Sequence, residues 1–167
     1  MEIRQLSAGD SEKYRTLRLE ALQSCPTAFA VSYEEEKKNN IDRYSQFLEN
    51  TGSYTFGAFL KTSLIGMITL RRESLIKLHH RAIIVAFYVK PGHQRKGIGK
   101  ALLTKTLQHA RQLEGLEQVY LSVVATNERA KNLYSTKGFQ VISFEKNAMK
   151  FEDTYYDEEQ MVLFLNE

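Results

Sequence analysis

The chain has 167 residues, of which 43% are hydrophobic and 26% charged, a composition typical of a soluble globular domain with one core. Its formal net charge of +3 excludes a generally basic nucleic-acid binder, and no apolar run approaches the roughly 18 residues of a membrane span. Cys25, the sole cysteine, excludes an internal disulfide and favours a reducing, cytoplasmic location, and the start of the chain lacks the apolar segment of a signal peptide. We expect one domain over residues 1–167, located in the cytoplasm and without nucleic-acid or membrane partners.

The N-terminal half of the chain predicts two helices among three strands. Alternating polar and apolar residues indicate strands, and apolar residues at helical spacing indicate helices. Asp10 or Ser11 can cap the first helix, and Cys25–Pro26 ends it. The expected elements are a strand at 2–6, this helix, a shorter helix at 41–49, and a hairpin of strands at 54–60 and 64–71.

The C-terminal half alternates apolar strands with helices. The expected elements are a strand at 82–89, a strongly amphipathic helix at 98–113, a strand at 119–124, a helix at 127–137 and late strands at 139–144 and 161–165. The segment between the two late strands has no clear pattern. Strands followed by a β-α-β-α-β section predict an α/β fold, with a mixed sheet whose central strands run parallel.

The turn before the amphipathic helix is rich in glycine and basic residues, and reads Gln94-Arg95-Lys96-Gly97-Ile98-Gly99. The first N–H groups of a helix have no intrahelical partner, and the helix dipole favours anions at that end. The glycines leave these amides accessible, while Arg95, Lys96 and Lys100 add positive charge. The turn therefore predicts a site for a pyrophosphate.

Two common nucleotide-binding motifs do not fit this turn. Gly92 and Gly97 have the spacing of a phosphate-binding loop, but Ile98 follows where that loop needs lysine. The dinucleotide fingerprint requires a third glycine three residues after Gly99, and that position is Leu102. The pattern that does fit is Gln-x-x-Gly-x-Gly.

Two motifs together identify a family resemblance. The Gln-x-x-Gly-x-Gly turn at 94–99 follows Val89-Lys90-Pro91-Gly92-His93, and Asn-x-x-Ala-x-x-Leu-Tyr at 127–134 precedes a Gly-Phe pair at 138–139. The chain thereby resembles the GNAT superfamily of acyl-CoA-dependent N-acetyltransferases, with looser similarity at 26–36 and 155–159. The resemblance implies a sheet of about six to seven strands with helices on both faces. It also implies acetyl-CoA as co-substrate, with no metal.

The resemblance implies how the cofactor would be held. Amides of residues 95–100 would bind the pyrophosphate, and the edge of residues 87–89 would pair with the pantetheine arm as an added strand does. A backbone N–H near Tyr88 or Val89 would face the thioester carbonyl. Asn127 would bond to the cofactor arm, and Lys131 could reach its phosphates. The implied cofactor-binding residues are Phe87, Tyr88, Val89, Gln94, Arg95, Lys96, Gly97, Ile98, Gly99, Lys100, Asn127 and Lys131.

Tyr134 is the catalytic residue that the resemblance implies. A thiolate leaves when the tetrahedral intermediate collapses, and a phenol with a pKa of about 10 can protonate a thiolate of about 8.5. A structural reading competes with this role, because Ala130, Leu133 and Tyr134 have the i, i+3, i+4 spacing of one buried helix face. The second motif favours the catalytic reading.

The sequence does not assign the general base. An attacking amine must be neutral, and many members of the family carry a Glu on the central strand to take its proton. No acid lies between Leu78 and Lys90, where Ile83 or Ile84 has the corresponding position. The remaining candidates are Glu73, His79, His80 and the Glu34-Glu35-Glu36 run, which also fit ordinary solvated surface groups. A chain of water molecules leading to bulk solvent could take the proton instead.

Acid and aromatic residues near both ends of the chain predict an acceptor site for a cationic amine. Glu35 and Glu158 belong to these acid groups, and the implied acceptor-binding residues are Tyr33, Glu34, Tyr156 and Asp157. An ordinary acidic surface is the alternative. A polyamine, an amino acid, an aminoglycoside or a peptide amino terminus would all fit.

The sequence thus predicts an N-acetyltransferase that moves the acetyl group of acetyl-CoA to a primary amine by direct attack in a ternary complex. Because the motifs contain no nucleophile, we expect no acyl-enzyme. The missing strand carboxylate leaves a second hypothesis open, a non-catalytic acyl-CoA sensor or regulatory module. Either a monomer or a homodimer is compatible with the sequence, and no residue spacing suggests a metal site.

Overall fold

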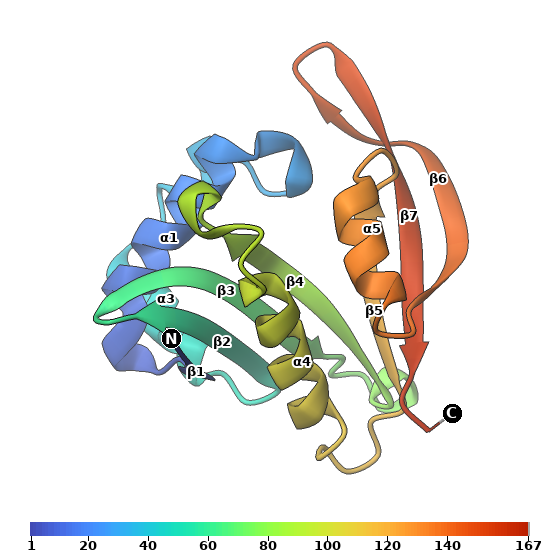
Figure 1. Ribbon diagram of the computed structural model, residues 1–167, viewed down its shortest axis with the longest axis horizontal. Helices are drawn as coiled ribbons and strands as arrows, with labels where there is room; N and C mark the ends of the chain where they lie inside the picture. The colour runs from blue at the N-terminus through green and yellow to red at the C-terminus, as the bar shows by residue number, and fades with distance from the viewer. Residues whose placement is uncertain (167) are drawn as a thin grey trace.

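The structure is a computed structural model that describes residues 1–166, and it is built on one seven-stranded sheet (Figure 1). The strand order is β1-β2-β3-β4-β5-β7-β6, and β4 with β5 is the parallel pair, while the other neighbours run antiparallel. The strands are β1 Glu2–Gln5, β2 Ser53–Leu60, β3 Ser63–Arg72, β4 Arg81–Val89, β5 Gln118–Val124, β6 Gln140–Phe151 and β7 Thr154–Phe164.

Five α-helices connect these strands, together with short 3-10 turns. The helices are α1 Ser11–Ser24, α2 Tyr33–Glu36, α3 Ile41–Glu49, α4 Ile98–Ala110 and α5 Glu128–Ser135. Among the described residues, no helix is both long and apolar enough to cross a membrane. The predicted mixed α/β sheet with helices on both faces is confirmed.

The element boundaries differ from the predictions mainly near the C-terminus. The unassigned segment between the late strands forms the end of β6, the turn and the start of β7. Together the two strands make a long hairpin, which projects from the sheet in Figure 1. Nearly all of β6 is exposed because it is the edge strand, so it lacks the alternating pattern that a buried face imposes. The helix predicted to end at residue 113 ends at Ala110, and turns follow it.

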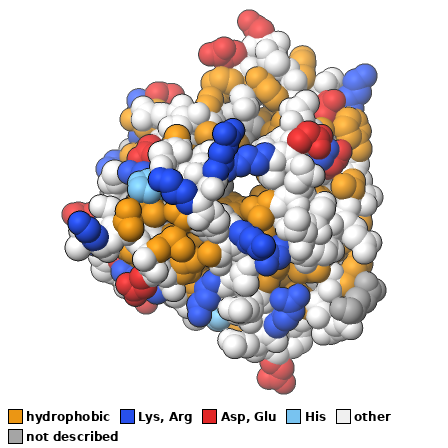
Figure 2. Space-filling model, viewed as in Figure 1, with side chains coloured by type: hydrophobic (Ala, Val, Ile, Leu, Met, Phe, Trp, Pro, Cys, Tyr) orange, Lys and Arg blue, Asp and Glu red, His pale blue; other side chains and the backbone are white. Residues whose placement is uncertain are grey.

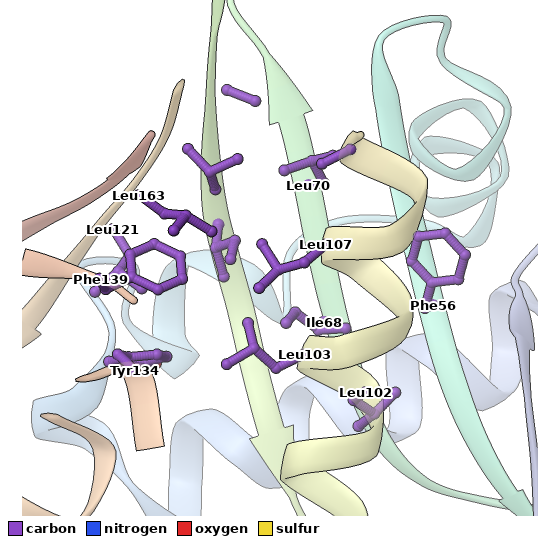
Figure 3. Close-up of a cluster of buried hydrophobic side chains, with 14 of the residues drawn as sticks. Phe56, Ile68, Leu70, Leu102, Leu103, Leu107, Leu121, Tyr134, Phe139 and Leu163 are labelled. Atoms are coloured by element: carbon purple, nitrogen blue, oxygen red, sulfur yellow. The ribbon is translucent and has the colours of Figure 1, made fainter. Parts of the chain in front are cut away.

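Two apolar clusters hold the helices to opposite faces of the sheet. In Figure 3 the leucines of α4 (Leu102, Leu103 and Leu107) lie against Ile68 and Leu70 of β3, and all five are almost fully buried. Helices α1 and α3 pack on the other face through the second cluster, which includes Leu17, Leu48 and Met67. Truncating one such leucine to alanine typically costs about 2–5 kcal/mol.

The sheet splays open between its two central strands. Parallel pairing joins Arg81–Ile83 of β4 to Gln118–Tyr120 of β5 and stops there, although both strands continue. A register shift in the β3–β4 pair follows, and Ala86 within it has a φ of 53°. A positive φ is unfavourable for a residue with a Cβ, so tertiary packing must hold this bulge. The bulge and the splay together leave two facing strand edges unpaired.

Candidate functional site

A cavity of about 370 Å³ lies in the splay beside the N-terminus of α4, and we call it the smaller cavity. All of the predicted cofactor-binding residues line it except Lys96 and Lys131, and Tyr134 lines it too. The chain therefore brings the glycine turn, the end of β4 and the start of α5 to one place. Residues outside the predicted cofactor-binding set complete the lining, and they are Cys25, Ala28, Phe29, Ser122, Val123, Val124 and, from the second motif, Arg129, Ala130 and Leu133.

The backbone of the glycine turn is shaped to receive an anion. Arg95 has a φ of 60°, and Gly97, the N-cap of α4, has a φ of 78°. Alternation of left-handed and right-handed residues turns successive N–H groups toward one point, which forms an anion-binding nest. A Cβ added to Gly97 would meet no heavy atom within 4 Å. The space in front of these amides is therefore open to a phosphate group.

Basic side chains surround the opening of the smaller cavity. Figure 2 shows a hollow on this face with several Lys and Arg side chains around it. Arg95, Lys100 and Arg129 belong to the lining, and all three are exposed. Lys96 instead donates to the carbonyl of Gly92 at 3.0 Å, so its ammonium group stabilises the turn. The charge around the opening suits a phosphate ligand.

Gln94 links the glycine turn to β4 and to α5. Its Nε2 donates to the carbonyl of Val89 at 2.9 Å, and its Oε1 accepts from Arg129 Nη1 of α5 at 2.7 Å. The Lys90 N–H donates to Ile65 of β3. Because successive residues of a strand direct their backbone groups to opposite sides, the N–H of Val89 points away from β3 and into the splay. This donor lies where the family resemblance expects one.

The structure separates the two predicted ligands of α5. Asn127 lines the smaller cavity and caps the helix, since its Oδ1 accepts from the N–H of Ala130 at 3.1 Å. The ammonium group of Lys131 donates to the carbonyl of Ala125 at 2.9 Å, and its Nζ lies 3.0 and 3.3 Å from carboxylates of Glu128 and Glu159. Lys131 therefore ties α5 to β7 and does not border the smaller cavity.

A second cavity, of about 600 Å³, adjoins the smaller one, and we call it the larger cavity. It is lined by α1–α3 and the segments that connect them, by β4 and β5 at the splay, and by single residues from β3, α5 and β7. Residues that line both cavities mark the junction between them, and they are Ala28, Phe29, Phe87, Ser122 and Tyr134.

Tyr134 belongs to both the core and the junction. Its relative exposure is 7%, and its ring centroid lies 5.8 Å from that of Phe139 and 6.2 Å from that of Phe87. Figure 3 shows it beside Phe139, at the edge of the apolar cluster. Burial raises the pKa of Tyr134 to about 12, so the phenol stays protonated through the neutral range. The structural and the chemical reading of this residue are thus compatible.

Both carboxylates and arginines line the larger cavity. Its charged lining residues are Arg18, Arg43, Arg71, Glu36 and Glu158. Glu36 accepts the O–H of Tyr44 at 3.0 Å. Burial and the negative charge of Glu145 raise the pKa of Glu158 above its ordinary value. Glu158 is therefore a carboxylate that takes up a proton more readily than usual.

The four predicted acceptor-binding residues do not line either cavity within residues 1–166. Tyr33 and Glu34 engage Lys37, through a cation–π contact and an ion pair. Asp157 accepts from the N–H of Asn147 at 2.7 Å, and Tyr156 pairs across the hairpin. The sequence also named Glu158 among the acid groups of the acceptor site and Glu36 among the candidate bases, and these two residues line the larger cavity. Side-chain direction at these positions depends on tertiary packing, which the sequence pattern does not reveal.

The structure also sorts the candidates for the general base. Glu73, His79 and His80 lie around the start of β4, at the end of the strand that is still paired with β5. They do not line the larger cavity, whereas Glu36 of the acidic run does. Within the described part of the chain, no group of His, Cys, Asp and Glu residues is arranged to hold a metal ion.

Comparison with known proteins agrees with this geometry. A model of the acetyltransferase (GNAT) family matches residues 17–139, which include both motifs and most of the two cavities. In a Salmonella typhimurium protein, yncA, solved with acetyl-CoA, the fold matches with a TM-score of 0.87 at 19% identity, over 100% of this chain and 95% of that one.

Two curated relatives are acetyltransferases of polyamines. Spermine/spermidine N(1)-acetyltransferase of Bacillus subtilis is 27% identical over 112 residues, which cover 66% of this chain and 72% of the relative. Spermidine N(1)-acetyltransferase of Thermoplasma acidophilum is 28% identical over 152 residues, which cover 84% of this chain and 89% of the relative.

Proposed function

The chain belongs to the acetyltransferase (GNAT) family and uses acetyl-CoA as its acetyl donor, and on that premise we propose that it passes the acetyl group through the junction of its two cavities to a primary amine. The donor occupies the smaller cavity, and the amine enters by the larger one. One observation carries this proposal: Tyr134, Phe87 and Ser122 line both cavities, so a thioester on one side and an amine on the other can meet there.

The residues of the smaller cavity divide the work of holding the donor. Amides of the turn at 95–100 and the side chains of Lys100 and Arg129 bind the pyrophosphate region. The unpaired edge of β4 accepts the pantetheine arm in the manner of an added strand. The N–H of Val89 then faces the thioester carbonyl, where a preorganised donor stabilises a developing oxyanion by about 3 kcal/mol.

The transfer needs two proton movements. The amine nitrogen forms a bond to the thioester carbon, the C–S bond breaks, and the thiolate of coenzyme A leaves. Tyr134 donates its phenolic proton to that thiolate, because the buried phenol is protonated at neutral pH. Glu158 takes the proton that the amine must lose, since its carboxylate lines the larger cavity and has a raised pKa.

Direct attack fits the residues of the smaller cavity better than a covalent intermediate. Cys25, the sole cysteine, lines the smaller cavity. Burial raises the pKa of its thiol, which keeps it in the protonated and weakly nucleophilic form. The amine therefore attacks the thioester itself, in a ternary complex.

The experiment that tests this function is acetyl-CoA-dependent thiol release against a panel of amines, with mass spectrometry of the products. We expect release that depends on an amine and yields the N-acetylated amine. If the protein binds acetyl-CoA but no amine on the panel stimulates release, the acyl-CoA sensor becomes the better account.

A further inference from the structure

Arg18 of α1 is a buried cation with an incomplete set of hydrogen bonds. It lines the larger cavity, and its relative exposure is 8%. Its Nη1 atom is shielded from solvent and has no hydrogen-bond partner among the described residues. Burying a charge without partners is costly, and native proteins usually pair such a group with an anion. Because Nη1 is shielded, an anion in the larger cavity would have to bind the guanidinium through its other nitrogens.

Glu36 does not supply a hydrogen-bond acceptor to this arginine. Its Oε1 lies 3.9 Å from Arg18 Nε, which is beyond hydrogen-bond range. The same oxygen already accepts the O–H of Tyr44 at 3.0 Å. Glu36 thus lowers the electrostatic cost of burying the guanidinium without filling its donor positions. A guanidinium offers a planar fork of N–H groups that matches a carboxylate.

The guanidinium lies close to the junction of the two cavities. Its Cζ is 5.0 Å from the ring centroid of Phe29, and Phe29 lines both cavities together with Tyr134. A ligand held at Arg18 would therefore have its neighbouring atoms near the place where the acetyl group is transferred. An α-amino acid carries its amine only two bonds from its carboxylate carbon, so it suits such a short separation.

The remaining charges in the larger cavity point the same way. Arg43 and Arg71 also line it, so three arginines and two carboxylates, Glu36 and Glu158, border this cavity. Arg43 and Arg71 are exposed, so solvent screens part of their charge, while Arg18 is buried. A polyamine, which is positive along its whole length, would meet these arginines without an anion to offer them. A zwitterion presents one group of each sign.

We propose that the acetyl acceptor is a small amino carboxylic acid whose carboxylate binds Arg18 while its amine faces the junction. This inference rests on the proposed function and adds the substrate class. The proposed acceptor differs from the polyamines for which the two curated relatives are named. Arg18 is then a specificity-determining residue that touches the acceptor.

The first test uses the unmodified protein and matched acceptors. Thiol release is measured with each of the common α-amino acids, with the carboxamide of each, with dipeptides that begin with the same residue, and with spermidine. We expect at least one free amino acid to be acetylated, with kcat/KM about 100-fold above that of its carboxamide, because the carboxamide lacks the charged partner of Arg18. A dipeptide used as well as the amino acid would move the carboxylate to a peptide source and overturn the free-acid form of the proposal.

The second test uses Arg18→Met and Arg18→Lys, with Arg111→Met at the exposed end of α4 as the matched control. Folding of each variant is checked by thermal unfolding and by acetyl-CoA binding. We expect Arg18→Met to lower kcat/KM for the amino acid about 100-fold, mainly through KM, with less than about a 3-fold change for the carboxamide. Arg18→Lys should restore part of the preference because it keeps the charge.

The outcomes separate this inference from the proposed function. If spermidine and the carboxamides are acetylated as well as the free amino acids, acetyl transfer stands and the carboxylate subsite is overturned. An unchanged ratio of amino acid to carboxamide in a folded Arg18→Met protein overturns it as well. If no amine at all stimulates thiol release, the proposed function fails together with the inference.

Discussion

The two cavities that meet in the splay are assembled from the chain in different ways. The smaller cavity takes most of its lining from two short stretches, 87–100 and 122–134. The larger cavity collects residues from three N-terminal helices and from several strands far apart in the sequence. Backbone conformation within a few residues shapes the first, and packing between remote elements shapes the second. A local motif can therefore specify how the donor binds, while acceptor binding depends on the whole fold.

The largest effect should come from Gly97→Asp, which should weaken the binding of acetyl-CoA in the smaller cavity. The new carboxylate would stand in the anion nest, and the residue would have to keep a φ of 78°. Repulsion and backbone strain together amount to about 4 kcal/mol, so acetyl-CoA should bind about 1000-fold more weakly by isothermal titration calorimetry. Gly97→Ala is the control for the backbone strain, because it adds a Cβ without a charge. Gly92→Asp is the control for the charge, because it adds a carboxylate outside the lining of the smaller cavity. Near-normal affinity of Gly97→Asp would remove the pyrophosphate assignment.

Tyr134→Phe should affect the junction and leave both binding sides intact. Loss of a general acid typically lowers the rate about 100-fold, so kcat should fall by that order while acetyl-CoA affinity changes less than about 2-fold. Tyr120→Phe is the matched control, since that phenol donates to Gln118 and lines neither cavity. A full kcat in Tyr134→Phe would leave Tyr134 with its place in the core alone.

The same contrast explains what the sequence could predict. The turn at 94–99 was readable because its glycines, its charges and the helix start are adjacent in the chain. The sequence named acids in α2 and β7 but could not choose among them, because the direction of the side chains brings Glu36 and Glu158, and not Glu34 and Asp157, to the larger cavity. The β6–β7 hairpin escaped prediction for a related reason: an exposed edge strand carries no burial pattern.

The family resemblance implies that Lys131 could reach the cofactor phosphates, whereas in the structure its ammonium group binds other residues of the protein. Its ammonium group is held by Glu159 of β7, which lies 28 residues away in the chain. We expect Lys131→Ala to leave acetyl-CoA affinity within about 2-fold and to lower the melting temperature, while Lys100→Ala weakens binding about 5-fold through the loss of a phosphate contact. The reverse order of the two affinities would show that Lys131 releases its carboxylates to reach the phosphates.

The smallest effect concerns the proton taken from the amine. As the proposed base, Glu158 would have to be ionised, so kcat/KM should fall as the pH drops through its pKa. Burial raises that pKa most, and the charge of Glu145, opposite Glu158 in the hairpin, raises it further. Glu145→Gln should therefore lower it and move the acidic limb of the pH profile to lower pH, whereas Glu152→Gln in the exposed hairpin turn should not. An unmoved limb in Glu145→Gln would argue against Glu158 as the base.

Initial rates of thiol release, measured over a matrix of acetyl-CoA and amine concentrations, test the meeting of the two cavities most directly. Direct attack at the junction requires both substrates on the protein at once. It predicts release that depends on the amine and double-reciprocal lines that intersect. Parallel lines, together with an acetylated protein that forms without the amine, would contradict the account, because the acetyl group would then leave coenzyme A before the acceptor arrives.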